Sequence, residues 1–464
     1  MRRDPPGDMS INKHILPLQA TPYSTAYLFS FVHSSQPVYK DSMRHPLLLL
    51  LLLIHLHPLQ AASITLNTWY PGIAVSKSTG FSTAVQVKKN TFYQFYVMQD
   101  GFDVELILTN STADTLAYMD TDNGTFGHEI INYLPNKDAV ITFQINGLSG
   151  DYNPDNGSVG FYIKAFTKKE KSRYDSLQTS LIAENKQHVL TADIDHFWSA
   201  FDKLAYCKNY YDSLTVFQNE YLDAATNGLQ AFMKVRALYA PEYLKVLKQE
   251  HDFYAGVRNN TYLAKTSSPL IEAVFDSLEV IYPHFKPFQV CFAIGAMRTG
   301  GTTTDQFILI GTELTTTGNV DRIPQRIKSI VAHESIHTQQ KYVLKQGAIA
   351  CNQLDECLDE GIANFIAEII TGTTNYGETD TYGYAHEAEL WQQFKQTLCA
   401  PNADNWLYNG DSAGDKPADL GYFIGYRIAK TYYQQAENKQ LAIIELIECD
   451  DPLDLLVKSG YDGK

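Results

Sequence analysis

Residues 64–167 alternate apolar and polar side chains with a period of two residues in several short segments. Clusters of Asp, Asn and Gly separate these segments, as is typical of tight turns between strands. The alternation predicts an all-β sandwich domain over residues 64–167. The segments that carry the pattern are VQVKKNTFYQFYVM, FDVELILTN, AVITFQI and SVGFYIKAF.

From residue 174 to the C-terminus, apolar residues recur mainly at helical spacing. Two apolar runs, FQVCFAIG and FILIGTEL, are typical of strands instead, and they flank the Gly- and Thr-rich segment RTGGTTTD. The pattern predicts an α+β domain over residues 174–464, mostly helical with a small sheet. The charged stretch KKEKSR, residues 168–173, lacks apolar anchors and is predicted to be a linker.

The N-terminal extension, residues 1–62, contains the pattern of a secretion signal. Arg44 precedes the apolar run Leu47–Leu56, and small residues follow at positions 61–63 as a cleavage site. The run is shorter than the roughly 20 apolar residues of a membrane-spanning helix. We therefore expect export to a secreted, periplasmic or cell-surface location, with no stable membrane span after signal removal.

The composition limits the classes of function. Hydrophobic residues make up 44% of the 464 residues and charged residues 19%, the balance of a globular protein. The formal net charge of −15 argues against nucleic acid as a partner. All six cysteines lie beyond the predicted sandwich, and an even number in an exported chain is compatible with three disulfide bonds.

The segment PQRIKSIVAHESIHTQQKYVL predicts a helix that carries two histidines and a glutamate. Pro324 is favourable in its first turn. His333 and His337 are one turn apart, so they project from one face and can bind the same zinc ion. Glu334 lies about 100° round the helix from His333, where it can hold a zinc-bound water without being a ligand. This is the H-E-x-x-H arrangement of metalloproteases.

A catalytic zinc ion needs a third protein ligand and an open coordination position. The segment LDECLDEGIANFIAEII predicts a second helix, on which Glu360 projects among small residues. Asp359 points about 100° away from Glu360, so both cannot coordinate easily. His386 is a further alternative ligand. Asn364, one turn after Glu360, is a candidate partner for His333 or a helix asparagine without a role.

HESIH followed by DEGIAN resembles the gluzincin clan, in which a glutamate in an E-G-x-A context on a downstream helix completes the zinc site. The resemblance selects Glu360 as third ligand and implies a zincin-like domain over residues 174–464. With AHESIHTQQ, DEGIANFIAE and PADLGYFIGYRIAKTYY, the chain from about Asp193 onward resembles bacterial predicted zinc-dependent proteases related to gliding-motility lipoproteins. The β-domain resembles the accessory prepeptidase-type domains of secreted bacterial proteases.

These residues predict a secreted zinc peptidase that acts on peptides or proteins, with Zn²⁺ as its cofactor. Glu334 would take the proton of the attacking water and deliver it to the leaving amine. Gluzincins often stabilise the oxyanion with a downstream tyrosine or histidine, for which Tyr422, Tyr426 and His386 are candidates. The strand FILIGTEL could align an extended peptide substrate by β-augmentation.

Other interpretations stay open at this stage. The chain could be a catalytically silent, envelope-associated or structural relative that retains the zinc fold, although the intact Glu334 argues against this. It could also be a zinc hydrolase that acts on a non-peptide bond, which would need a different pocket. The pair Gly300-Gly301 is predicted to be a turn, because no GK[ST] sequence follows that would indicate a phosphate-binding loop.

Overall fold

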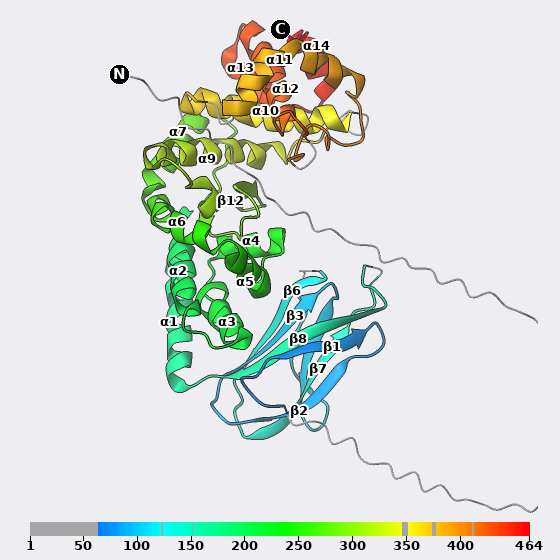
Figure 1. Ribbon diagram of the computed structural model, residues 1–464, viewed down its shortest axis with the longest axis vertical. Coiled ribbons are helices and arrows are strands. Elements are labelled where there is room, and N and C mark those ends of the chain that lie inside the picture. The colour runs from blue at the N-terminus through cyan, green and yellow to red at the C-terminus, as the bar shows by residue number, and fades with distance from the viewer. Residues whose placement is uncertain (1–63, 122–123, 151, 346–350, 374–376, 411–412) are drawn as a thin grey trace, which may run out of the picture.

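The computed structural model describes residues 64–121, 124–150, 152–345, 351–373, 377–410 and 413–464. These residues form an all-β region followed by a mostly helical region with a small sheet (Figure 1). This part of the sequence-based prediction is confirmed. The secretion signal predicted at positions 43–63 lies outside the described residues. Within the described ranges, no helix is long and apolar enough to cross a membrane.

The β-sandwich consists of two four-stranded antiparallel sheets with the strand orders β1-β8-β3-β6 and β2-β7-β4-β5. Phe95, Phe143 and Phe161 are fully buried between the two sheets. In β2 every second residue is buried, as the alternation of its sequence predicts. The strands are β1 (Tyr70–Ser76), β2 (Phe81–Val87), β3 (Tyr93–Asp100), β4 (Val104–Thr109), β5 (Thr115–Met119), β6 (Phe126–Tyr133), β7 (Ala139–Gly147) and β8 (Asn156–Ala165).

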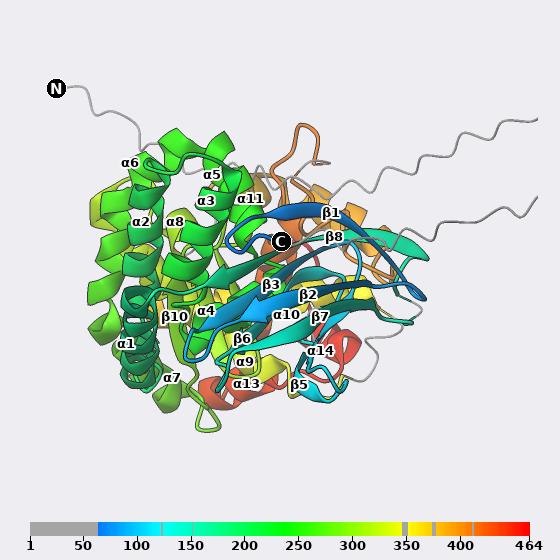
Figure 2. The same ribbon diagram turned by 90° about the horizontal axis from the view of Figure 1, so that it is seen from below.

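In the sheet β1-β8-β3-β6, the central strands β3 and β8 are buried on both faces, because the helical region, seen beside them in Figure 2, packs on their outer side. Tyr96 of β3 and Tyr162 of β8 stack with ring centroids 4.8 Å apart, and both belong to the core of the helical region. Tyr211 of helix α3 meets Tyr162 edge-on at 5.6 Å. The central strand β3 is therefore buried at successive positions and does not alternate.

Residues 168–173, predicted to link the two domains, form the first turns of helix α1 (Lys168–Glu184). Thr167 and Glu170 form a capping box, in which each side chain accepts a hydrogen bond from the other residue's backbone N–H. Lys171 and Asp175 add an ion pair one turn apart. This charged stretch without apolar residues is therefore the solvated start of a helix. Helix α1 directly follows the β-sandwich and connects it to the helical region.

The helical region contains a four-stranded sheet in the order β11-β12-β10-β9. Its strands are β9 (Val189–Leu190), β10 (Gln289–Ala293), β11 (Gly301–Thr303) and β12 (Phe307–Gly311). Its helices are α1, α2 (Ala192–Leu204), α3 (Tyr210–Phe217), α4 (Asn227–Arg236), α5 (Ala240–Gln249), α6 (His251–Thr261), α7 (Ser268–Ile281), α8 (Thr312–Thr315), α9 (Ile323–Gln340), α10 (Asn352–Thr371), α11 (Gly377–Gln396), α12 (Leu420–Gln435), α13 (Lys439–Ile447) and α14 (Pro452–Ser459). A π-helical turn lies at Gln218–Leu222, and 3₁₀ turns lie at Tyr262–Thr266 and Val320–Arg322.

Two expectations about this sheet need correction. Gly301 is the first residue of β11, an edge strand antiparallel to β12, and does not lie in a simple turn. The FILIG segment is β12, which pairs with β10 on one side and β11 on the other. It therefore offers no free edge to a peptide. A three-residue strand of Gly and Thr carries no apolar pattern, so the sequence did not indicate it.

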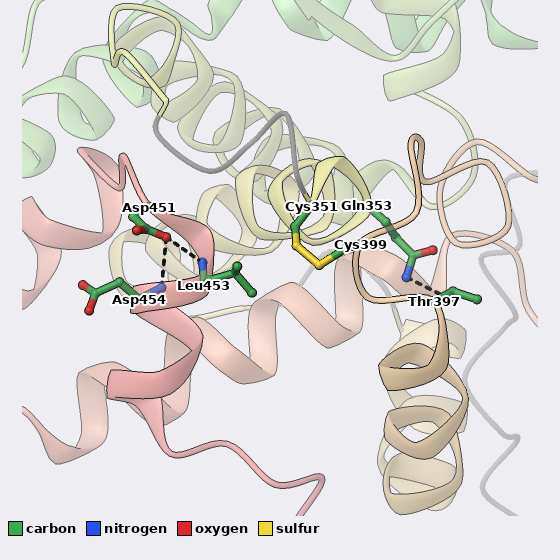
Figure 3. The surroundings of a disulfide bond; sticks show 7 residues. All are labelled: Cys351, Gln353, Thr397, Cys399, Asp451, Leu453 and Asp454. Carbon is green, nitrogen blue, oxygen red and sulfur yellow. Dashed lines mark hydrogen bonds between the residues drawn. A yellow bond between two sulfur atoms is a disulfide. The ribbon is translucent and has the colours of Figure 1, made fainter.

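A disulfide bond joins Cys351, just before α10, to Cys399, just after α11 (Figure 3). The remaining cysteines, Cys207, Cys291, Cys357 and Cys449, are free thiols. The structure therefore contains one of the three disulfide bonds with which the cysteine count was compatible. Cys291 and Cys357 lie within β10 and α10 and are fully buried, so they act as small apolar side chains.

Candidate metal centre

Three potential metal ligands converge from helices α9 and α10. Nε2 of His337 lies 3.0 Å from Nε2 of His333 and 3.1 Å from Oε2 of Glu360. Nε2 of His333 lies 3.2 Å from the same carboxylate oxygen. Among the described residues, this is the group of His, Cys, Asp or Glu side chains that could hold a metal ion.

The spacing and chemistry of these atoms fit a zinc ion. Zinc binds imidazole nitrogen and carboxylate oxygen at about 2.0–2.2 Å, so two ligands of one tetrahedral ion lie roughly 3.3–3.5 Å apart. The three observed separations are slightly shorter than this. All three ligands would leave a fourth position open, as in catalytic sites. Two imidazoles and one carboxylate form a donor set used by zinc peptidases.

The position of Glu360 depends on a close contact between two helices. A Cβ atom at Gly361 of α10 would overlap the backbone of Gly425 and Tyr426 on α12, and one at Gly425 would overlap the backbone of Cys357. Two facing glycines therefore allow α10 and α12 to cross almost backbone to backbone. Glu360 immediately precedes this crossing point on α10, and α10 lies beside α9 (Figure 1).

Helix α9 begins with Pro324 in its first turn and packs its apolar residues into the core of the helical region. Nδ1 of His337 lies 2.8 Å from Oε1 of Gln340, whose amide nitrogen donates to the carbonyl of Asp359 at 3.1 Å. Gln340 therefore selects the His337 tautomer that directs Nε2 toward Glu360. Sequence reasoning missed Gln340, although its position one turn after His337 was a usable signal.

Nδ1 of His333 has a different environment. Of the atoms that the structure describes, Nδ1 of His333 and the side-chain oxygen of Asn364 are buried without a hydrogen-bond partner. An N–H and a carbonyl oxygen are complementary, and leaving both unpaired is costly. No hydrogen bond joins these two atoms, so the role of Asn364 as the partner that orients His333 stays a prediction.

Glu334 lies on α9 between the two histidines and is buried. Its carboxylate contacts Gly301 of the edge strand β11, where a Cβ atom would overlap it. Burial raises the pKa of Glu334, while the charges of His333 and His337 oppose that shift. A carboxylate with a raised pKa, held beside the metal ligands but outside the group, is suited to proton transfer.

Tyr408 is a member of the site that sequence reasoning missed. Its hydroxyl donates to Oε1 of Glu360, and a further hydrogen bond joins it to Tyr422. Asp419 accepts a hydrogen bond of 2.6 Å from the backbone N–H of Tyr408, whose φ of 56° is left-handed. Tyr408 lies between α11 and α12 in the irregular segment LYNG, so no periodic pattern distinguished it from the other 29 of the 30 tyrosines.

The two predicted tyrosines share a face of α12 but have different partners. The Tyr422 ring lies over His333, with centroids 6.2 Å apart and planes tilted by 28°. The hydroxyl of Tyr426 instead donates to Glu368 and accepts from Lys430. Glu368 follows Glu360 by two helical turns, about 12 Å along the axis. The structure therefore brings Tyr422 to the candidate ligand His333 and does not bring Tyr426 to the candidate ligands.

The alternative ligands also lie elsewhere. Asp359 forms an ion pair of 2.6 Å with Lys345, which also contacts Asp355 at 3.0 Å. His386 stacks on Tyr382 on helix α11, with ring centroids 4.2 Å apart, and its side chain is 42% exposed. Neither side chain reaches the group formed by His333, His337 and Glu360.

His337 and Glu360 strongly influence each other's ionisation. Burial lowers the pKa of His337, but the charge of Glu360 and its hydrogen bond raise it, with a net result of about 10. Burial raises the pKa of Glu360, but the two histidines hold it well below its usual range. Desolvation and the charge of Glu360 raise the pKa of Tyr408, so this phenol keeps its proton and remains a hydrogen-bond donor.

Residues 297–450 match the model of a protein family described as "Predicted Zn-dependent protease (DUF2268)". The matched segment contains Gly301, Glu334, the three candidate ligands and Tyr408. The description of this family supports a zinc-dependent protease and names no narrower class of enzyme.

A solved structure is also similar to part of the chain. It is the pre-peptidase C-terminal domain of a collagenase from Bacillus anthracis, with 18% sequence identity and a TM-score of 0.18. The likeness covers 21% of this chain and 90% of the collagenase domain. None of the curated proteins matches this chain.

Proposed function

We propose that the protein is an exported zinc peptidase with a zincin-like domain of the gluzincin type over residues 174–464 and a β-sandwich accessory domain over residues 64–167. The observation that carries the proposal is the convergence of His333, His337 and Glu360, whose ligand atoms lie 3.0–3.2 Å apart. The match to a family described as a predicted zinc-dependent protease supports it.

These three side chains would hold Zn²⁺, with Gln340 orienting His337. When bound, zinc would polarise the scissile carbonyl and lower the pKa of a water molecule to about 7. Glu334 would accept a proton from the attacking water and deliver it to the leaving amine. Its burial supports this role, because burial raises the pKa of its carboxylate and so favours acceptance of a proton.

Tyr408 is the best placed residue to stabilise the developing oxyanion, in place of Tyr426. Its phenol is protonated and reaches the ligand Glu360, and Tyr422 supports it from the side. Donating a hydrogen bond to the negatively charged oxygen that forms during attack would stabilise the transition state. Tyr422 is then a positioning residue that contacts both Tyr408 and His333.

An extended peptide would align along the edge strand β11. The sequence suggested this role for the FILIG segment, which is β12 and has a neighbour on both sides. Within the described residues, β11 pairs with β12 and has no neighbour on its other side. Its backbone N–H and C=O groups could therefore pair with a substrate strand. The contact between Gly301 and Glu334 would place such a peptide backbone beside the proton-transferring carboxylate.

The proposal is tested by comparing wild-type protein, Glu334→Gln and the control Glu279→Gln. The control changes an exposed glutamate on α7, which packs against α9. We expect wild type and control to cleave an unstructured protein substrate in the presence of zinc, and Glu334→Gln to retain zinc but lose activity. Equal cleavage by wild type and Glu334→Gln would contradict the mechanism. Zinc binding without cleavage by any form would favour the catalytically silent alternative.

Export is part of the proposal and rests on the signal pattern at positions 43–63. We expect a tagged full-length chain, expressed in its own host, to appear outside the cytoplasm with a mature N-terminus near Ser63. Retention of residues 43–62 in the cytoplasmic fraction would contradict export and would leave the proposed chemistry unaffected.

A further inference from the structure

The loop that leads from β10 into the edge strand β11 has a strained backbone. Ala296 and Met297 are consecutive residues with left-handed φ angles of 50° and 58°, although neither is glycine. A side chain makes this conformation unfavourable, so surrounding contacts must hold it in place. Residues in such conformations cluster at functional sites, and this loop leads directly into Gly301, which contacts the carboxylate of Glu334.

The carboxylate of Glu313 on helix α8 holds this loop from inside the fold. The side chain is fully buried, and it accepts hydrogen bonds from the backbone N–H groups of Gly295 at 3.0 Å and Met297 at 2.8 Å. These two N–H groups converge on one carboxylate because the backbone between them is left-handed, as in the anion-binding turns formed by successive backbone N–H groups. A buried carboxylate is costly unless it is hydrogen-bonded, so the loop and Glu313 stabilise each other.

Further contacts fix both ends of the loop. At its start, the carbonyl of Ile294 accepts hydrogen bonds from the hydroxyls of Tyr221 at 2.7 Å and Tyr243 at 2.8 Å. At its end, Gly311, the last residue of β12, donates its backbone N–H to the carbonyl of Gly300 at 3.1 Å. Helix α8 directly follows β12, so one short corner of the chain supports both the loop and the strand that pairs with β11.

We propose that Glu313 is a positioning residue, which fixes the loop and thereby holds strand β11 beside Glu334 in the place where it can align a substrate. The inference rests on the proposed peptidase function. The place of Gly301 is narrowly limited, because a Cβ atom there would overlap Glu334. A loop that relaxed toward ordinary backbone angles would move Gly301, and the strand that it begins, relative to this carboxylate. Glu313 acts through the backbone of the loop and takes no part in the chemistry itself.

Hydrogen exchange would measure the hold on the strand without any substrate. Glu313→Gln keeps one accepting oxygen and replaces the other with an NH₂ group, which can only donate, so one backbone N–H of the loop loses its acceptor. We expect amide exchange in residues 295–303 to become faster by about tenfold or more. The matched control is Asp193→Asn, which changes another fully buried carboxylate that accepts from a backbone N–H, that of Thr226. The control should leave exchange in residues 295–303 unchanged.

Kinetics on the zinc-loaded enzyme would separate positioning from general stability. The substrates are an extended peptide that can lie along β11 and a blocked dipeptide that spans only the scissile bond. We expect Glu313→Gln to retain zinc and to raise KM for the extended peptide by about tenfold, with KM and kcat for the dipeptide unchanged. Asp193→Asn should leave both values of KM unchanged. Tyr243→Phe, which removes one of the two hydroxyls that donate to Ile294, should shift exchange and KM in the same direction by a smaller factor.

The possible outcomes distinguish this inference from the proposed function. Unchanged exchange in both Glu313→Gln and Tyr243→Phe would overturn the role of Glu313, as would faster exchange with no change in KM for the extended peptide. If Glu313→Gln does not fold, Tyr243→Phe alone decides by the same two measurements. A wild type that cleaves neither substrate would contradict the proposed peptidase function instead, and the exchange measurement would then decide whether Glu313 holds β11 in place.

Discussion

Gly301 of strand β11 lies directly against the carboxylate of Glu334 on helix α9. A Cβ atom at Gly301 would lie 2.9 Å from Cδ and 3.0 Å from Cγ of Glu334, closer than side chains tolerate. The edge strand and the proposed proton-transferring residue can therefore approach each other only because residue 301 has no side chain. This contact places β11, the strand proposed to align the substrate, beside Glu334, the residue proposed to transfer the proton.

Gly301→Ala should displace the Glu334 side chain and reduce kcat/KM by roughly tenfold to a hundredfold, because a shift of about 1 Å in a catalytic group has that cost. Gly300→Ala is the matched control, since a Cβ atom there would meet Ile330 at an ordinary 3.6 Å. Peptide hydrolysis and zinc content would be measured for both variants. Equal activities of the two variants, with zinc retained, would contradict the proposed position of Glu334 in the mechanism.

Tyr408→Phe removes the hydroxyl that contacts Glu360. We expect kcat to fall by about 10²–10³-fold with zinc still bound, as for loss of one oxyanion donor. Tyr426→Phe is the control from the sequence-based prediction, because its hydroxyl contacts Glu368 and Lys430. Steady-state kinetics would distinguish the two. A large loss of kcat in Tyr426→Phe and none in Tyr408→Phe would instead support Tyr426 as the residue that stabilises the oxyanion.

Glu313 should make stability depend on pH. Its buried carboxylate accepts backbone hydrogen bonds from Gly295 at 3.0 Å and Met297 at 2.8 Å, which holds the turn before β11. Burial raises its pKa from 4.5 to about 7, although these hydrogen bonds oppose the shift. The folded-state pKa lies above the unfolded value, so this contribution to stability is complete below pH 4.5 and is lost as the pH rises through about 7.

Urea unfolding at pH 5 and pH 8 would therefore compare wild type with Glu313→Gln. We expect the wild type to lose about 2–3 kcal/mol more of its free energy of unfolding across this interval than the variant, because an uncharged amide does not ionise. A pH dependence that is the same in both proteins would show that Glu313 is ionised at little cost.

The disulfide bond between Cys351 and Cys399 should stabilise the fold around helix α10. It closes a loop with a sequence separation of 48 residues, for which the loss of unfolded-state entropy is about 4 kcal/mol. Cys399→Ala should lower the free energy of unfolding by roughly that amount, and a reducing agent should do the same to wild type. Cys207→Ser, at a partly exposed free thiol, is the control. If reduction leaves the unfolding curve of wild type unchanged, the bond contributes little.

The structure brings together the three candidate metal ligands that the sequence indicated, and for the two histidines this follows from local helical geometry. A spacing of one turn places His333 and His337 on one face regardless of the rest of the fold. Glu360 follows His337 by 23 positions, and its selection over Asp359 depended on the resemblance to gluzincins. The structure gives a physical reason for that selection, because Asp359 pairs with Lys345 and Gly361 forms the helix crossing.

The rest of the site depends on contacts that have no periodic signature. Tyr408 reaches Glu360 through a left-handed backbone conformation held by Asp419, and neither is marked by a pattern in the sequence. Tyr422 and Tyr426 share a helix face, as predicted, but their hydroxyls contact different partners because α10 runs past both of them. The edge strand β11 has three residues, which is too short for an alternation to be recognised.

The central claim is that His333, His337 and Glu360 together hold one zinc ion. The most direct measurement is the zinc content and zinc affinity of purified wild type, Glu360→Ala and Asp359→Ala. We predict about one zinc per chain in wild type and in Asp359→Ala, whose side chain contacts Lys345, and a strong loss of affinity in Glu360→Ala. Zinc binding that is unchanged in Glu360→Ala, or lost in Asp359→Ala instead, would contradict this account of the site.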